Sequence, residues 1–301
     1  MRSLPEFPEF TRLELEHREE LEGWFARWPP LTSELTFTNL YLWRGTYQPT
    51  LTVIGGMLVV RAQPEQQEAF FLPPVGGGDM GAVCHRLLAW LGERAARPSL
   101  QRVPAPMAAA LGGAGRPFLA TPTPEHSDYL YRTLDLIYLQ GNRYHPKRSH
   151  IHKFESEHRW EYRRLTPDLL DQCRQLQERW CEQRGCEEAG PALGGEHQAV
   201  MSLLADWERL GARGGVILVG GRVVAFSAGE QLNPTTAVIH VEKAAPDLPG
   251  LYQLINREFA REWAQLQYIN REQDLGDPGL RKAKQSYYPH HLVDKFMVIA
   301  A

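Results

Sequence analysis

The stretch GGVILVGGRVVAFSAGE (214–230), followed by AVIHVEKA (237–244), decides the fold. Apolar side chains recur at a period near two in both stretches, which is typical of β-strands. Gly220 and Gly221 split the first stretch at a two-residue turn, so it predicts a β-hairpin. A turn at 233–236 then leads into AVIHVEKA as a third antiparallel strand.

Apolar residues recur at helical spacing both before and after these strands in the sequence. The expected elements are helices over 166–185 and 196–210, the three strands, a helix over 249–263, a strand over 266–270, a helix over 280–287 and a strand over 291–299. This is an α+β layout with mainly antiparallel strands flanked by helices. Its order resembles that of the GNAT (acyl-CoA N-acyltransferase-like) acyltransferase fold.

The first part of the chain predicts a second α+β domain. Gly55 and Gly56 lie between two strand-like runs and indicate a hairpin. The glycine run 76–78 precedes a helix expected from Met80, where Asp79 is a good N-cap and a phosphate cradle is the alternative. Proline and threonine alternate over 121–129 and mark a boundary, so we expect domains at 1–125 and 126–301.

Composition excludes several protein classes. The 301 residues carry 33 Lys+Arg and 36 Asp+Glu, a net charge of −3, so the overall charge does not indicate a nucleic-acid or polyanion binder, and any such contact must be local. No apolar run approaches the roughly 20 residues that span a bilayer, and the N-terminus lacks a signal peptide, so we expect a cytoplasmic protein. The four cysteines include no C-x-x-C pair and are expected to be buried thiols rather than metal ligands.

Five motifs together resemble a family of uncharacterised bacterial proteins named for the C-terminal domain of phosphatidylglycerol lysyltransferase. They are SELTFTNLYLWR (33–44), GNRYHPKRSHIHKF (141–154), GGVILVGGRVVAFSAGE (214–230), AVIHVEKA (237–244) and YINREQDLGDPGLRKAKQSYYP (268–289). The resemblance implies two GNAT-like domains in tandem, related to Fem-type peptidyltransferases. Those enzymes move an aminoacyl group from aminoacyl-tRNA to an amine or hydroxyl acceptor.

Acyl transfer needs a base for the acceptor, charge stabilisation at the carbonyl oxygen and a proton for the leaving group. In a GNAT-like sheet these groups gather where the third and fourth strands separate. Strand alternation would place His240 and Glu242 on one face there, where the imidazole and the carboxylate could act together as the general base. The alternative is that Glu242 forms an ion pair and His240 is a hydrogen-bonded sheet residue. Tyr288, or its neighbour Tyr287, is the candidate proton donor for the leaving group.

The loop APDLPGL (245–251) is where a CoA-dependent GNAT enzyme would bind pyrophosphate on backbone amides. Here Asp247 adds negative charge and Pro249 removes an N–H donor. Only Gly250 remains of the glycine-rich pattern of that loop. Acetyl-CoA is therefore disfavoured, and we expect no cofactor.

Polar residues of the motif 268–289 are the candidate substrate-binding groups, because they follow a strand end or share a helix face. They are Asn270, Arg271, Asp274, Arg281 and Lys284. Asn39 and Arg44 in the first domain are candidates for a further wall of the site. A solvated, ion-paired helix is the alternative for Arg281 and Lys284. Capping by Ser33 and core packing by Trp43 are the alternatives for the first-domain group.

Residues 142–164 hold seven Lys and Arg against three Glu, the one basic stretch of the chain. Four of its residues are candidates for contact with tRNA phosphates: Arg143, Lys147, Arg148 and Lys153. The alternative is a solvated helix. His150 and His152 are two residues apart, the wrong spacing for joint metal ligation from one helix, so no metal is expected.

These observations predict an aminoacyltransferase that uses aminoacyl-tRNA and a small-molecule or peptide acceptor. The membrane-bound lysyltransferases carry many transmembrane helices that this sequence does not show, so a phospholipid acceptor is disfavoured. A non-catalytic tandem GNAT-like domain that binds an amino acid, peptide or RNA is the alternative. An acetyl-CoA-dependent N-acetyltransferase is the third possibility.

Overall fold

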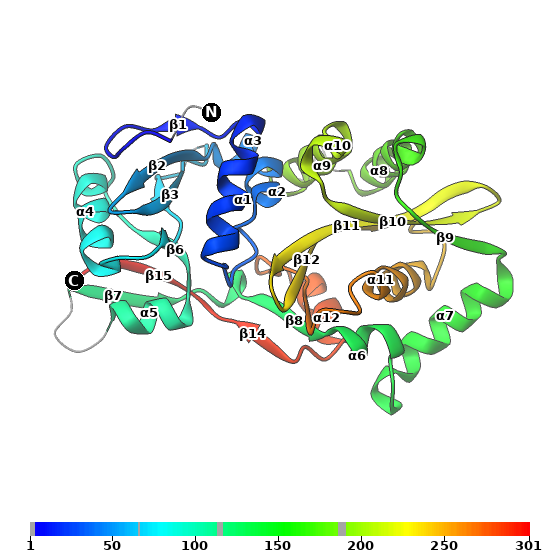
Figure 1. Cartoon of the computed structure of the whole chain (residues 1–301). Coiled ribbons are helices and arrows are strands. Elements are labelled where there is room, and N and C mark those ends of the chain that lie inside the picture. The colour runs from blue at the N-terminus through cyan, green and yellow to red at the C-terminus, as the bar shows by residue number, and fades with distance from the viewer. Residues whose placement is uncertain (1–3, 66, 113–116, 186–190) are drawn as a thin grey trace. The chain divides into compact units, whose positions relative to one another are not determined.

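The computed structural model describes residues 4–65, 67–112, 117–185 and 191–301. Its chain divides into two compact units, shown in Figure 1. Unit 1 contains Met1–Asp128, Gln273–Pro278 and Leu292–Ala301, and unit 2 contains Tyr129–Glu272 and Gly279–His291. Each unit is built around its own β-sheet.

The sheet of unit 1 has the strand order β1-β2-β3-β4-β6-β15-β7, with β5 paired to β3. Its strands are β1 (Thr11–Arg12), β2 (Thr50–Ile54), β3 (Met57–Ala62), β4 (Phe70–Phe71), β5 (Val75–Gly76), β6 (Leu100–Pro104), β7 (Phe118–Pro122) and β15 (Lys295–Ala300). Its helices are α1 (Arg18–Arg27), α2 (Phe37–Leu42), α3 (Arg44–Tyr47), α4 (Met80–Gly92) and α5 (Ala105–Leu111), with the 3₁₀ turns η1 (Leu15–His17) and η2 (Pro124–His126).

Local sequence explains the elements of unit 1. Gly55 and Gly56 take the left-handed backbone, with φ of 57° and 74°, so the β2–β3 hairpin closes with the predicted two-residue turn. The Asp79 side chain accepts a hydrogen bond from the Ala82 amide at 3.0 Å and caps α4. The capping interpretation of the glycine run is therefore confirmed. Buried Leu87 and Leu91 of α4 pack in the core against the sheet.

The last strand differs from the sequence expectation. Residues 291–299 form two strands, β14 (His291–Val293) and β15. β15 pairs antiparallel with both β6 and β7, so it belongs to the sheet of unit 1 rather than to the second expected domain. Its Val298 is fully buried in the core of unit 1. Strand periodicity shows that a segment is extended, but it does not show which sheet takes it up.

The sheet of unit 2 has the order β14-β8-β13-β12-β11-β10-β9 among the described residues. Its other strands are β8 (Asp128–Arg132), β9 (Trp160–Arg164), β10 (Arg213–Val219), β11 (Arg222–Asn233), β12 (Thr236–Ala244) and β13 (Tyr268–Asn270). The predicted antiparallel hairpin and third strand are confirmed as β10, β11 and β12. The parallel β12–β13 pair is joined by a helical crossover, as the sequence order requires.

Helices cover both faces of this sheet (Figure 1). The helices are α6 (Thr133–Tyr138), α7 (His145–Glu157), α8 (Leu170–Arg184), α9 (Pro191–Ala205), α10 (Trp207–Leu210), α11 (Leu251–Arg261) and α12 (Pro278–Gln285), with the 3₁₀ turns η3 (Asn142–Tyr144) and η4 (Pro167–Leu169). α11 packs on β10, β11 and β12 from one face and α8 from the other. Buried Leu254, Ile255 and Phe259 of α11 centre the core of unit 2.

The cysteine expectation holds at two positions and fails at one. Cys84 and Cys173 are buried free thiols, and burial raises the pKa of each to about 12. Cys181 instead takes part in a disulfide, so the expectation of a thiol is wrong there. Cys186 lies outside the described residues.

Two further properties follow from the described residues. None of their helices is both long and apolar enough to cross a membrane. In the same ranges, no group of three or more His, Cys, Asp or Glu side chains could hold a metal ion.

Candidate functional site

The polar residues of unit 2 gather where β12 separates from β13. The described pairing of these strands covers only three residues on each side, from Thr236–Tyr268 to Val238–Asn270. β12 continues beyond Val238 to Ala244 along β11 alone. His240 and Glu242 lie on this separated part, and Arg271 and Glu272 follow directly after β13. The sequence placed the candidate site at this point.

A β-bulge lies in the middle of the site. Ala228 pairs with Val241 and Gly229 pairs with Ile239, so His240 is an extra residue on β12. A Cβ at Gly229 would lie 2.2 Å from the Val238 carbonyl oxygen, so only glycine fits this close approach. Bulges redirect side chains. Because the bulge lies at His240, simple alternation along β12 does not predict whether the His240 and Glu242 side chains share a face.

The His240 imidazole lies between two carboxylates. Its Nδ1 is 2.8 Å from Glu272 Oε1 and its Nε2 is 2.9 Å from Glu230 Oε1. Burial alone lowers the pKa of His240, but the hydrogen bonds to Glu230 and Glu272 outweigh burial and raise the pKa to about 10. At neutral pH the ring is an imidazolium that donates from both nitrogens. In this arrangement His240 organises two carboxylates and has no lone pair with which to accept a proton.

Asn270 holds one of those carboxylates in place. The Glu272 backbone is left-handed, with φ of 56°, a conformation that costs energy for a residue other than glycine. The Asn270 Oδ1 accepts a hydrogen bond from the Glu272 amide at 2.7 Å and stabilises this turn. Asn270 itself is fully buried. This contact gives Asn270 a role in positioning Glu272.

Glu242 forms a separate cluster with Arg271 and Asn256, which we name the β12 carboxylate cluster. Arg271 Nη2 is 2.9 Å from Glu242 Oε1, and Asn256 Nδ2 donates to Glu242 Oε2 at 3.0 Å. The Arg271 guanidinium carbon also lies 5.0 Å from the centre of the Tyr287 ring and 5.7 Å from that of Tyr131. Glu242 is therefore ion-paired, as the alternative interpretation expected.

Two atoms of this cluster have no hydrogen-bond partner among the described residues. They are Arg271 Nη1, a donor, and Asn256 Oδ1, an acceptor, and both are buried. An unpaired buried polar group costs about 1–3 kcal/mol, so native proteins rarely keep one without a reason. A donor and an acceptor on either side of one carboxylate complement a ligand that carries a carbonyl oxygen and an N–H group.

The helix α12 brings further candidates to the same unit. Lys284 is buried, and its Nζ donates to the Arg271 carbonyl oxygen at 2.6 Å, so it supports the turn that carries Arg271. Arg281 is half-buried on the same helix. Tyr288 is 44% exposed and stacks edge-on against Tyr144, with ring centres 5.5 Å apart. The neighbouring Tyr287 is buried and is the tyrosine beside Arg271.

Three other predicted residues belong to unit 1. The Asp274 carboxylate is buried and accepts from the Gly276 amide at 2.8 Å, an arrangement that shapes its own turn. Asn39 is buried in α2, in the helical turn that Thr36 caps. Arg44 Nη1 donates to the Tyr41 carbonyl oxygen at 2.7 Å, with its guanidinium over the Tyr41 ring. Each of these residues has a local structural partner.

Sequence reasoning missed a buried charge cluster in unit 1, formed by Glu34, Asp128 and Lys295. Lys295 Nζ lies 2.8 Å from both Glu34 oxygens and 2.6 Å from Asp128 Oδ1. The Ser33 amide and hydroxyl both donate to the Asp128 carboxylate at 2.9 Å. The sequence signal for this cluster was Lys295, a charged residue at the start of the otherwise apolar run 295–299. Glu230, Asn256 and Tyr131 of unit 2 were also missed.

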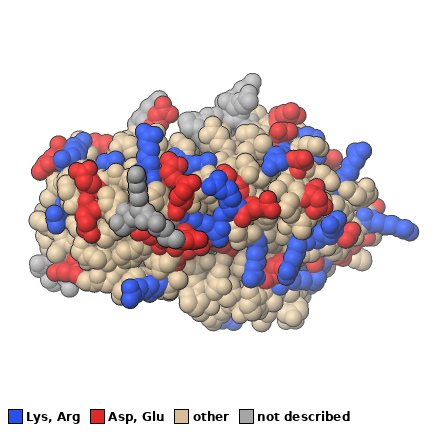
Figure 2. Space-filling view, turned by 45° about the horizontal axis from the view of Figure 1, so that its top comes forward, with Lys and Arg blue, Asp and Glu red and all other residues tan. Residues whose placement is uncertain are grey.

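The basic stretch forms α7 and β9. Lys147 Nζ donates to the Ser286 hydroxyl at 2.6 Å, and Arg148 donates to the Leu139 and Gly141 carbonyl oxygens. Both side chains therefore turn toward the protein. Arg143 and Lys153 are exposed and lie near Asp135 and Glu157. Figure 2 shows Lys and Arg interspersed with Asp and Glu over the face drawn, so charge of one sign does not dominate it.

The junction between β12 and α11 offers few free amides. Gly250 has a φ of 91°, and a Cβ there would lie 2.3 Å from the His150 carbonyl oxygen of α7. The Leu251 amide already donates to the Leu248 carbonyl oxygen at 3.3 Å. Backbone of α7 therefore lies against the start of α11, where an acyl-CoA pyrophosphate would need amides.

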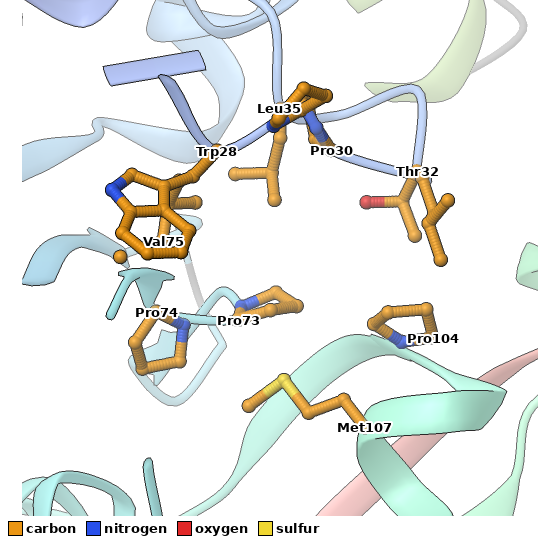
Figure 3. A pocket seen from close by; sticks show the side chains of 12 residues that line it. Trp28, Pro30, Thr32, Leu35, Pro73, Pro74, Val75, Pro104 and Met107 are labelled. Atoms are coloured by element: carbon orange, nitrogen blue, oxygen red, sulfur yellow. The ribbon is translucent and has the colours of Figure 1, made fainter. Parts of the chain in front are cut away.

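A cavity of about 260 Å³ in unit 1 has a different character (Figure 3). Trp28, Leu35, Met107 and several prolines surround it. None of its described lining residues carries a charge. It offers no group for proton transfer, so the chemistry of acyl transfer is better matched by the β12 carboxylate cluster.

Residues 25–299 match the family described as phosphatidylglycerol lysyltransferase, C-terminal. The chain belongs to this family. The resemblance seen in the sequence motifs is therefore confirmed, and the family match includes strands of both sheets. No curated protein matches the chain significantly.

Several solved structures have a fold similar to that of this chain. A conserved protein of unknown function from Bacteroides thetaiotaomicron is 34% identical, with a TM-score of 0.90, and the match covers 97% of this chain and 99% of that one. L-PGS from Bacillus licheniformis has 15% identity, a TM-score of 0.65 and coverage of 99% and 94%. FemX has 9% identity, a TM-score of 0.58 and coverage of 97% of each chain. The expectation of a tandem GNAT-like α+β fold is confirmed.

Proposed function

We propose that this chain is an acyltransferase that moves an aminoacyl group from aminoacyl-tRNA to an amine or hydroxyl group of a small-molecule or peptide acceptor. The family match and the Fem-like fold support an aminoacyl-type transferase of the lysyltransferase kind. The observation that carries the proposal is the β12 carboxylate cluster with its two unpaired buried atoms. It lies where the sheet opens, and it can meet both polar ends of an aminoacyl group.

In the proposed reaction the acceptor nitrogen or oxygen bonds to the ester carbonyl carbon, and the ester bond to the tRNA ribose breaks. The proton lost by the acceptor ends on the ribose oxygen. Glu242 takes the acceptor proton, and Arg271 Nη1 donates to the carbonyl oxygen as negative charge develops there. Tyr288 or Tyr287 supplies the proton of the leaving group. The Glu230–His240–Glu272 group holds the turn and provides negative charge for a cationic substrate group.

Three kinds of contact accompany this reaction in the proposal. Arg271, Asn270, Lys284 and Arg281 of unit 2 shape the aminoacyl site. Exposed Arg143 and Lys153 meet tRNA phosphates, with Lys147 and Arg148 beside them. The crowded β12–α11 junction supports a donor other than acetyl-CoA, and no cofactor is needed for ester aminolysis.

A direct test incubates the purified protein with tRNA charged with labelled amino acids, and separately with acetyl-CoA, in the presence of amine and hydroxyl acceptors. We expect loss of aminoacyl-tRNA above its spontaneous hydrolysis, and a labelled product. Consumption of acetyl-CoA with intact aminoacyl-tRNA would overturn the donor assignment. Replacing Glu242 with Gln should slow the transfer.

One observation favours the second candidate function, a non-catalytic binding domain. Both residues first considered as bases already have hydrogen-bond partners on each of their polar side-chain atoms, His240 between two carboxylates and Glu242 between Arg271 and Asn256. A thermal-shift panel with amino acids, aminoacyl analogues, CoA and tRNA at two salt concentrations separates the two functions. Stabilisation by an aminoacyl analogue without any transfer would favour the binding domain.

A further inference from the structure

A second cavity, of about 320 Å³, lies between α6, α7 and α11 of unit 2. These three helices are close together in Figure 1, and α11 contacts both of the others. The lining residues are Ile137, Tyr138, Leu139, Arg148, Ile151, His152, Glu155, Arg257 and Arg261. The volume lies at the small end of the roughly 300–1,000 Å³ that ligand pockets occupy. We name it the three-arginine pocket.

Helical spacing assembles the walls of this pocket. Ile151 and His152 are each three or four residues from both Arg148 and Glu155, so these four residues share one face of α7. Arg257 and Arg261 are four residues apart and share a face of α11. The remaining wall comes from the C-terminal end of α6. Ile137, Leu139 and Ile151 are buried, and they give the pocket an apolar floor.

The three guanidinium groups are held in place and keep spare donors. Arg148 donates through Nη1 to two backbone carbonyl oxygens and meets no carboxylate. Arg257 donates to Glu258 and Glu155 through Nε and Nη2, and Arg261 donates to Glu258 through Nη1. Arg148 Nη2, Arg257 Nη1 and Arg261 Nη2 therefore have no acceptor among the described residues. Three arginines face two glutamates, so the pocket carries an excess positive charge.

We infer that the three-arginine pocket binds the phosphate group of a nucleotide. A tetrahedral phosphate has enough oxygens to accept from several guanidinium groups at once, and arginine binds phosphate through paired N–H groups. Its negative charge neutralises the excess positive charge of the walls. The Tyr138 ring is 60% exposed at the rim, which gives the base or sugar a flat surface to stack on. This site is distinct from the β12 carboxylate cluster, and the inference does not depend on the transfer reaction.

Isothermal titration of the full chain at low salt tests the inference with adenosine 5′-monophosphate, inorganic phosphate and adenosine as probes. We expect the monophosphate to bind more tightly than inorganic phosphate, and adenosine to bind at least tenfold more weakly than the monophosphate.

Arg261→Gln should weaken monophosphate binding at least tenfold. Arg159→Gln removes an exposed arginine outside the pocket and should leave binding unchanged. Tyr138→Ala should weaken the monophosphate but not inorganic phosphate.

Arg148→Gln provides a second variant in a different helix, and its folding is checked by circular dichroism. A short RNA with and without a 5′-phosphate distinguishes a free nucleotide from an RNA end as the source of the phosphate. Either source with the expected variant pattern supports the inference. Equal binding of adenosine and its monophosphate, an unchanged Arg261→Gln variant, or no binding of any probe would overturn it.

Discussion

Each unit contains a charged cluster, buried in unit 1 and half-buried in unit 2, and the two clusters differ in how completely they are paired. In unit 1, Lys295 Nζ has three carboxylate oxygens within 2.8 Å, and both Asp128 oxygens are hydrogen-bonded. In unit 2, Glu242 is also paired through both oxygens, but Arg271 Nη1 and Asn256 Oδ1 are not. Complete pairing is what stability requires of buried charge. Incomplete pairing at an opening in a sheet marks the cluster that is suited to a ligand.

The largest effect that this comparison predicts is on transfer activity. Glu242→Gln keeps the shape and a hydrogen-bonding oxygen, but it removes the group that takes the acceptor proton. We expect transfer from aminoacyl-tRNA to slow by roughly 10²–10⁴-fold, the usual contribution of a positioned base. Glu161→Gln, at an exposed position of β9, is the matched control. Unchanged transfer in Glu242→Gln would remove Glu242 from the reaction.

Breaking the unit 1 cluster should lower the free energy of unfolding rather than the transfer rate. Lys295→Met removes the lysine that joins Glu34 and Asp128 and leaves only Arg102, 3.5 Å from Glu34, as a nearby cation. Breaking a buried ion pair costs about 3–5 kcal/mol. We expect a matching drop in the free energy of unfolding, measured with urea. Arg27→Met, at an exposed position of α1, should change it little. If Lys295→Met were as stable as the control, the cluster would not hold the fold together.

The pKa values of two histidines should be shifted in opposite directions from the ordinary value. Carboxylates raise the pKa of His240 to about 10, while burial, Arg102 and Lys295 lower that of His126 to about 3. The contribution of His240 to stability is therefore full below pH 6.5 and is lost as pH rises toward 10. That of His126 is full above 6.5 and is lost as pH falls toward 3. NMR titration of the imidazole signals checks both, and a His240 midpoint near 6.5 would contradict the carboxylate pairing.

The smallest effect concerns an exposed contact in unit 1. Asp79→Ala removes the N-cap of α4, which costs about 1 kcal/mol of unfolding free energy. Asp79→Asn retains a capping oxygen and should recover most of that loss. Urea unfolding compares the three proteins. Transfer activity should be the same in all of them, because the cap belongs to unit 1 and carries no chemistry.

Local patterns predicted much of the fold. The Gly220–Gly221 turn, the Asp79 cap and the helical spacing before Gly185 each depend on neighbouring residues, and each is present. The separation of β12 from β13, where we predict the site, is also expected from element order. Long-range pairing could not be predicted in this way. Lys295 joins Glu34 across 261 positions of sequence, and periodicity carries no information on such a partner.

The side-chain contacts of the candidate site also could not be predicted from the sequence. The bulge at His240 requires Gly229 on the neighbouring strand, so alternation along β12 alone could not place His240 relative to Glu242. Asn256 lies among apolar residues of α11, and only the packing of that helix on β12 brings it to Glu242. Residue type made Glu242 and Arg271 candidates. Tertiary packing decided what they contact.

The most direct test of the account is a crystal structure with a 3′-aminoacylamino-3′-deoxyadenosine, whose amide bond is a stable analogue of the aminoacyl ester. We predict the aminoacyl carbonyl oxygen within about 3 Å of Arg271 Nη1 and the α-amino group at Asn256 Oδ1. Electron density for the analogue elsewhere, with both of these atoms still unpaired, would contradict the assignment of the β12 carboxylate cluster as the transfer site.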